Sequence, residues 1–68
     1  MKISARNQIT GKIVAITKGA TTAHVKIEIA PNVLVTASIT NESVDELGLA
    51  IGKAATAVIK SSDVIIGK

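Results

Sequence analysis

The sequence of 68 residues contains no cysteine and no phenylalanine, tyrosine or tryptophan. Without cysteine the chain has neither disulfides nor thiolate metal sites, and nothing indicates an oxidising compartment. Without aromatic residues its core must be built from valine, isoleucine, leucine and alanine, which bury less area per side chain. A chain of this length also buries only about 60% of its unfolded surface. We therefore expect contacts between subunits to supply part of the stability.

Long hydrophobic runs and a strong excess of charge are also missing. No apolar run approaches the roughly 20 residues that span a bilayer, and the N-terminus has no hydrophobic signal segment. Lysine and arginine total 8 against 5 aspartate and glutamate residues, which gives a formal charge of +3 and a pI near 9.6. This charge is compatible with an anionic partner and equally with a solvated basic surface. We expect a cytoplasmic protein without membrane contact.

Apolar and polar residues alternate along most of the chain, which predicts an all-β protein. Between Ala23 and Ile29 every second residue is apolar, as in a half-buried antiparallel strand. The order of strands, with one short helix between the third and the fourth, fits the OB-fold, a five-stranded Greek-key barrel. The expected strands are Ile9–Thr17, Thr21–Ile29, Val33–Thr40, Ala54–Lys60 and Asp63–Ile66.

Single residues predict where the short helix and the first turn lie. Asn41 is the expected N-cap of the helix, and Gly48 is the glycine that ends it. Gly19 is expected at positive φ in the turn after the first strand.

The first expected strand carries apolar residues on both faces. Simple alternation places Ile13 and Ala15 on one face and Val14 and Ile16 on the other. Burial on both faces indicates a strand at a subunit interface.

Two clusters of hydrogen-bond donors flank the apolar strands. The first is Ser4-Ala5-Arg6-Asn7-Gln8, in which a guanidinium, a hydroxyl and two amides are able to surround an oxyanion. The second is Lys60-Ser61-Ser62, an ammonium followed by hydroxyls, with Asp63 as the one carboxylate near it. Because the first and last strands of small barrels often lie close together, the two clusters suggest one pocket.

These clusters and several other segments resemble those of the molbindins, or Mop proteins, a family of small cytoplasmic molybdate-binding proteins. The resemblance covers essentially the whole chain, so residues 1–68 would form a single Mop domain. It implies a non-catalytic protein that binds molybdate, and tungstate, for intracellular storage or homeostasis. It also implies a hexamer, built as a trimer of dimers, with sites between subunits and no organic cofactor. The matching segments are Ser4–Gln8, Gly11–Val14, Thr40–Ser43, Leu47–Leu49, Thr56–Ser61 and Asp63–Val64.

The resemblance also implies which residues contact the oxyanion. Ser4, Arg6, Lys60 and Ser61 match contacting residues of the family, helped by backbone amides around Ala5. The two cations would offset the charge of the dianion, and the hydroxyls would adapt to its geometry. Molybdenum would be held inside molybdate, without a side chain as a direct metal ligand.

Two further pairs of residues match the family with a second role open to each. Thr40 and Ser43 match residues at the site, yet they flank the expected helix start, where capping is their ordinary role. Lys18 and Gly19 would belong to a possible second class of site on a symmetry axis. His24 is a lone histidine without a second histidine or a cysteine, which favours a solvated or interface side chain over a metal ligand.

The residues themselves leave other function classes to weigh. An enzyme is disfavoured because one histidine does not assemble a nucleophile, a base and an orienting group. A nucleic-acid-binding OB module is the main alternative, although the aromatic side chains that stack bases, worth about 1–3 kcal/mol each, are missing. A purely structural assembly domain is the third possible function, because it does not explain the hydrogen-bond donors of the two clusters. We expect a small oxyanion ligand and no nucleic-acid partner.

Overall fold

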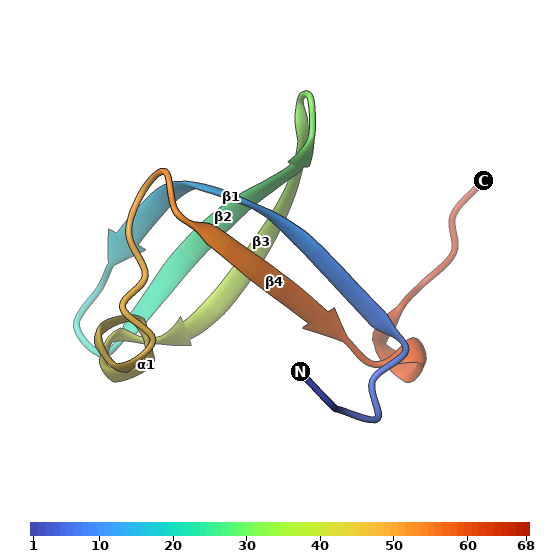
Figure 1. The fold of residues 1–68 in the computed structure, drawn as a ribbon, viewed down its shortest axis with the longest axis horizontal. Coiled ribbons are helices and arrows are strands. Elements are labelled where there is room, and N and C mark those ends of the chain that lie inside the picture. Colours follow the sequence, from blue (N-terminus) through green and yellow to red (C-terminus); the bar gives the residue numbers. More distant parts are fainter.

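Four of the five expected strands form, and they make one antiparallel sheet in the computed structural model, which describes residues 1–68. The sheet order is β3-β2-β1-β4, so β3 and β4 are both edge strands (Figure 1). The helix lies between β3 and β4 in the chain, as expected. It is too short to span a membrane. The elements are β1 Asn7–Lys18, β2 Thr22–Ala30, β3 Val33–Thr40, α1 Asn41–Glu46 and β4 Ala54–Ile59.

The long strand β1 serves both halves of the sheet. Its first half, from Asn7 to Lys12, pairs with β4, and its second half, from Lys12 to Lys18, pairs with β2. At Gly11 a Cβ atom would overlap the carbonyl oxygen of Glu28 on β2, so only glycine permits this approach. The sheet therefore curls around β1 into an open, half-closed barrel (Figure 1).

A β-bulge in β1 overturns the expected alternation of that strand. Ile13 pairs with Ile27 while Ala15 pairs with Lys26, so one extra residue, Val14, lies between the two pairs. The extra residue shifts every later side chain to the opposite face. Ile16, rather than Ala15, consequently joins Ile13 on the core side.

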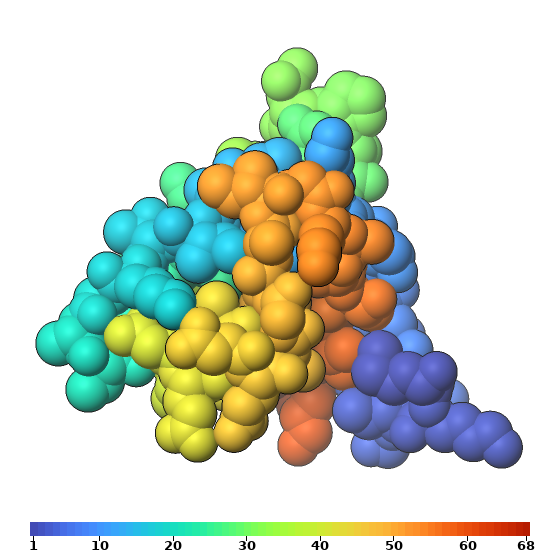
Figure 2. Space-filling model, turned by 60° about the vertical axis from the view of Figure 1, so that its left-hand side comes forward, coloured from blue at the N-terminus to red at the C-terminus, as the bar shows by residue number.

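The core is as thin as the composition predicts. Only five residues are fully buried, and three of them come from the alternating face of β2, which confirms that prediction. One comes from α1, which closes one end of the concave face; in the space-filling view it forms a continuous surface with the segment after it (Figure 2). The buried residues are Ile13, Ala23, Val25, Ile27 and Val44.

Two of the three local predictions about turns and caps are wrong. The N-cap of α1 is Thr40, one residue before Asn41, because the threonine hydroxyl accepts from the amide of Ser43. Gly19 does not have positive φ; its amide donates to the carbonyl of Thr22 at 2.8 Å within an ordinary tight turn. Gly48 has a φ of +63° directly after the helix, as predicted.

The fifth expected strand is not found in the chain. Ser61–Asp63 form a single 3₁₀ turn, closed by a bond from the amide of Asp63 to the carbonyl of Lys60 at 2.9 Å. This turn directs Val64, Ile65 and Ile66 away from the sheet, where they are 46%, 92% and 85% exposed. A five-stranded barrel is therefore not completed within one chain, and the outer edges of β3 and β4 stay unpaired.

Candidate oxyanion-binding site

The fold brings the two donor-rich clusters to the same end of the sheet. Asn7 pairs with Ile59 in the antiparallel register of β1 and β4. Arg6 directly precedes this pair and Lys60 directly follows it, so the two cations leave adjacent strand ends (Figure 1). Residues more than 50 positions apart in sequence thus meet at one place.

The four side chains proposed to contact the anion have no partners within the chain. Ser4, Arg6, Lys60 and Ser61 are all exposed, and none of them makes a side-chain hydrogen bond. The one ion pair of the chain lies elsewhere, so Asp63 neutralises neither cation. Two cations without an ion-pair partner and two hydroxyls without a hydrogen bond therefore lie in the segments that flank this end of the β1–β4 pair.

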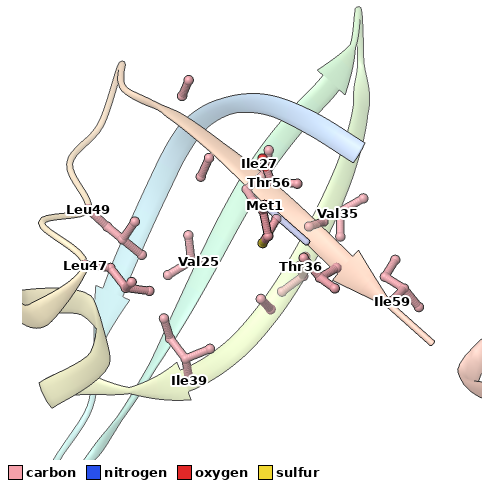
Figure 3. Close-up of a pocket in the computed structure, with 15 residues that line it drawn as sticks. Met1, Val25, Ile27, Val35, Thr36, Ile39, Leu47, Leu49, Thr56 and Ile59 are labelled. Atoms are coloured by element: carbon pink, nitrogen blue, oxygen red, sulfur yellow. The ribbon is translucent and has the colours of Figure 1, made fainter. Parts of the chain in front are cut away.

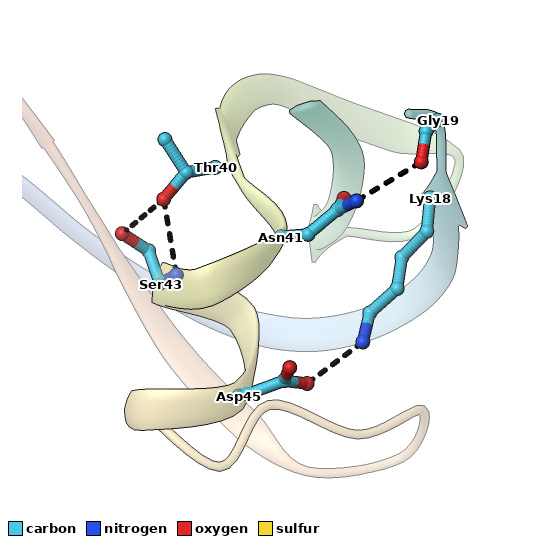
Figure 4. Close-up of polar contacts among 6 residues, drawn as sticks. All are labelled: Lys18, Gly19, Thr40, Asn41, Ser43 and Asp45. Carbon is cyan, nitrogen blue, oxygen red and sulfur yellow. Dashed lines mark hydrogen bonds and ion pairs between the residues drawn. The ribbon is translucent and has the colours of Figure 1, made fainter. Parts of the chain in front are cut away.

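Thr40 and Ser43 form the cap that begins α1 (Figure 4). The Thr40 hydroxyl accepts from the Ser43 amide at 3.0 Å and donates to the Ser43 hydroxyl oxygen at 2.8 Å. Capping is thus the role that both residues perform inside the chain. The hydrogen of the Ser43 hydroxyl remains available to another acceptor, so an additional anion contact is compatible with the cap.

Thr40 and Ser43 lie far from the four unpaired donors of the same chain. Thr40 pairs with Thr22, beside the turn that follows β1, whereas Arg6 and Lys60 lie at the start of β1. At about 3.3 Å per residue, the twelve residues of β1 put more than about 30 Å of strand between the two groups. Figure 1 shows α1 and the start of β1 on opposite sides of the molecule, so one small anion does not touch both groups in one chain.

Lys18 and Gly19, the expected second site, are engaged in holding the β1–β2 turn against α1. The ammonium of Lys18 lies 2.7 Å from Asp45 Oδ1, and the carbonyl of Gly19 accepts from Asn41 Nδ2 at 2.9 Å (Figure 4). These contacts join residues 22 and 27 positions apart. No local sequence signal marks Asn41 and Asp45 as the partners, so sequence reasoning missed them.

The concave side of the sheet holds an apolar groove of about 730 Å³ that the sequence did not predict. Side chains from β2, β3 and β4 and from the segment after α1 converge on it (Figure 3). Thirteen of its fifteen lining residues are hydrophobic and none has a charged side chain, which disfavours it as a site for a dianion.

Comparison with known proteins identifies the family. The TOBE domain matches residues 3–66. The chain belongs to the TOBE domain family. Within it, the chain is 53% identical over 66 residues to molybdenum-pterin-binding protein 3 of Clostridium pasteurianum, with 97% of each chain covered. The resemblance to the Mop proteins is therefore confirmed.

Solved structures of molybdate-related proteins superpose closely on this chain. MopII of C. pasteurianum is 49% identical with a TM-score of 0.90, over 98% of this chain and all of that one. A molybdate-binding protein of Sporomusa ovata is 32% identical with a TM-score of 0.92, over the full length of both. The cytoplasmic molybdate-binding protein ModG, solved with molybdate bound, is 43% identical with a TM-score of 0.90, over 96% of this chain and 46% of its own. These relatives are described as binding proteins rather than enzymes.

Proposed function

We propose that this TOBE protein binds molybdate, and tungstate, as an intact oxyanion and does not transform it. The observation that carries the proposal is the set of unpaired donors and cations at the open end of β1 and β4. An uncompensated guanidinium and ammonium on adjacent strand ends favour a dianion, and free hydroxyls complete its hydrogen bonds. Relatives described as molybdate-binding or molybdenum-pterin-binding proteins support this ligand.

Each residue has a defined task in the proposed site. Arg6 supplies a fixed charge and a planar fork of donors, and Lys60 supplies a second charge. Ser4 and Ser61 donate through rotatable hydroxyls, and backbone amides around Ala5 add fixed donors. Molybdenum stays inside its own oxygen shell, so the protein needs neither a direct metal ligand nor an organic cofactor.

We propose further that each site lies between copies of the chain. The Ser4–Arg6 and Lys60–Ser61 donors are at one end of β1, and Thr40 and Ser43 are at the other. A site that uses both groups takes the first from one copy and the second from its neighbour. The hexamer of three dimers rests on the resemblance to molbindins.

The groove and the unpaired strand edges support such association. An exposed strand edge is a template for pairing with another chain, and a large apolar groove is stable only when covered. The exposed segment Val64–Ile66 has the apolar character to cover it and does not reach the groove of its own chain. We propose that this segment of a second copy supplies the fifth strand of the barrel.

The remaining expectations are parts of the same proposal. Residues 1–68 would act as a single Mop domain in the cytoplasm, and the role would be molybdenum storage or homeostasis. A second class of site at Lys18 and Gly19 would require the Lys18–Asp45 pair to open, so we rank it behind the first.

Calorimetry on the unmodified protein tests the proposal, with native mass spectrometry measuring how many anions each assembly holds. We expect molybdate and tungstate to bind similarly, sulfate more weakly because it is smaller, and phosphate most weakly. Hydrogen phosphate carries a proton, and no carboxylate contacts Arg6 or Lys60 to accept it, so the mismatch should cost about one to two decades of affinity. Equal affinity for phosphate and molybdate, or tight binding of single-stranded DNA in place of molybdate, would overturn it.

A further inference from the structure

Two amide side chains beside the proposed site each donate one hydrogen bond to a backbone carbonyl. Asn7 Nδ2 donates to the carbonyl of Ile59 at 3.2 Å, and Gln8 Nε2 donates to the carbonyl of Ala5 at 3.2 Å. From the sequence both amides are candidates to surround the anion. In the structure one donor of each amide is bonded to the chain itself.

The Asn7 bond joins the two strands at the point where the cations leave them. Ile59 directly precedes Lys60, and Asn7 directly follows Arg6, so this bond fixes Arg6 and Lys60 next to each other. Asn7 is half-buried and pairs with Ile59 at the last position of the β1–β4 ladder. Strand ends fray most readily, and two like charges here favour separation. The side-chain bond opposes both tendencies.

The Gln8 bond fixes the orientation of a peptide unit within the first cluster. Its acceptor is the carbonyl of Ala5, which shares a planar peptide group with the amide of Arg6. In a trans peptide the N–H points away from the C=O, so anchoring the carbonyl also aims the Arg6 amide. The chain bends at Ser4 and at Arg6, and Gln8 holds the segment between these bends.

We propose that Asn7 and Gln8 are positioning residues of the oxyanion site, which set its donors in place and do not touch the anion. This inference rests on the proposed function. Each side-chain amide has two N–H donors, and one donor of Asn7 and one of Gln8 are bonded to a backbone carbonyl of the chain. Exposed arginine and lysine side chains lose conformational freedom on binding, and a fixed backbone beneath them reduces that loss.

The test compares variants of matched shape in the full chain. Asn7→Leu and Gln8→Met remove the donors and keep most of the side-chain volume. The control is Thr10→Val, which removes the hydroxyl pair between Thr10 and Thr56, 3.0 Å apart, from the same two strands three residues away. Each variant loses one exposed or half-buried bond, so similar losses of folding stability are expected from all three.

Molybdate affinity should separate the positioning variants from the control. We expect about three- to tenfold weaker binding for Asn7→Leu and for Gln8→Met, and less than about twofold for Thr10→Val. The same substitutions are then made in Arg6→Lys, which keeps the charge but not the planar fork whose orientation matters. In that background the effect of Gln8→Met should fall to about twofold or less. Full additivity would mean that Gln8 acts on binding independently of Arg6, and would overturn the inference.

A second measurement needs no anion, so it separates this inference from the proposed function. Amide ¹⁵N relaxation of the ligand-free protein should show greater mobility at Arg6 and Lys60 in Asn7→Leu, and at Arg6 in Gln8→Met. Thr10→Val should leave both amides unchanged. Unchanged mobility in all three variants would overturn the inference even if molybdate binds. If the unmodified protein does not bind molybdate, the proposed function fails, whereas the mobility still decides whether the amides order this end of the sheet.

Discussion

The two ends of β1 carry similar polar residues, but they differ in whether the charged side chains have partners within the chain. At the α1 end, Lys18 pairs with Asp45, and the carbonyl of Gly19 accepts from Asn41. At the other end, Arg6 and Lys60 lie beside each other with no carboxylate bonded to either. The cation at the α1 end is paired, although the buried Oδ1 of Asn41 there has no hydrogen-bond partner. The two cations at the other end are both unpaired.

This difference shows that residue type alone does not mark a binding site. The sequence has a lysine followed by a small residue at both ends, glycine after Lys18 and serine after Lys60. The helix brings a carboxylate to Lys18, whereas the turn after β4 brings none into contact with Lys60. Free donors with uncompensated charge are what an oxyanion requires.

Blocking association of the subunits should have the largest effect on molybdate binding. It would separate the Arg6 end of β1 in one copy from the Thr40 end in another, and the proposed site uses both. Ile65 and Ile66 are 92% and 85% exposed within the chain, so replacing both by glutamate costs little inside one copy. We expect sedimentation to change from a species several-fold heavier than 6.9 kDa to the monomer, with loss of molybdate binding. Gly67→Glu with Lys68→Gln makes the same change in net charge and should leave the assembly intact. An unchanged assembly in Ile65→Glu with Ile66→Glu would contradict the shared-barrel proposal.

Removing the guanidinium should have the next largest effect and act on one end only. Arg6→Ala should weaken molybdate binding roughly 100-fold, since a charge-assisted hydrogen bond contributes about 1.5–3 kcal/mol. Folding stability should hardly change, because Arg6 makes no bond within the chain. Calorimetry measures the affinity, with Lys12→Ala on the same strand as the control for net charge. Equal losses in both variants would mean that net charge, rather than the site, attracts the anion.

Substitution at the helix cap should have the reverse effect to Arg6→Ala and should mainly lower the folding stability. Thr40→Ala removes the acceptor of the Ser43 amide and should cost about 1 kcal/mol of unfolding free energy, measured by urea titration. Ser38→Ala, on the same strand and without a side-chain bond, should cost less. Thr40→Ser keeps the hydroxyl and should retain both the stability and any anion contact across subunits. Equal stability of Thr40→Ala and Ser38→Ala would show that the cap does not stabilise the fold.

The smallest effect is expected at the ion pair. Lys18 and Asp45 have side chains that are 45% and 69% exposed, and pairs as exposed as this contribute less than about 1 kcal/mol. Lys18→Met should lower stability slightly at low salt and not at all near 1 M salt, where the pair is screened. Lys26→Met serves as the charge control. A tenfold loss of molybdate affinity in Lys18→Met would instead favour a site at this end.

The sequence predicted the parts of the fold that repeat a local pattern. The alternation in β2 identified its buried face, and Asn32 with its φ of +62° lies in the turn that Pro31 and Asn32 indicate. The β-bulge at Val14 escaped prediction because no local residue pattern distinguishes it from regular alternation. Gly11 is required by the approach of β2, a contact that depends on residues 17 positions away.

The prediction of a fifth strand was wrong for a different physical reason. Asp63–Ile66 has suitable residues, but a strand forms only where a free edge lies within reach. The 3₁₀ turn at Ser61–Asp63 directs the segment away from both free edges of its own sheet. The donor clusters were easier to predict, since antiparallel pairing of β1 with β4 is enough to join them. That one amide donor of Asn7 and one of Gln8 bond to the backbone depended on the folded geometry, which the sequence does not show.

The register of β1 against β4 also sets an order of events during folding. The β2–β3 hairpin closes over a short turn, whereas the Asn7–Ile59 contact closes a loop of about 50 residues and carries a larger entropic cost. The end of the sheet that holds the proposed site should therefore be the last region to acquire its native contacts and the first to release them. A bound dianion would then stabilise contacts that form late in folding. It should therefore slow unfolding more than it speeds folding.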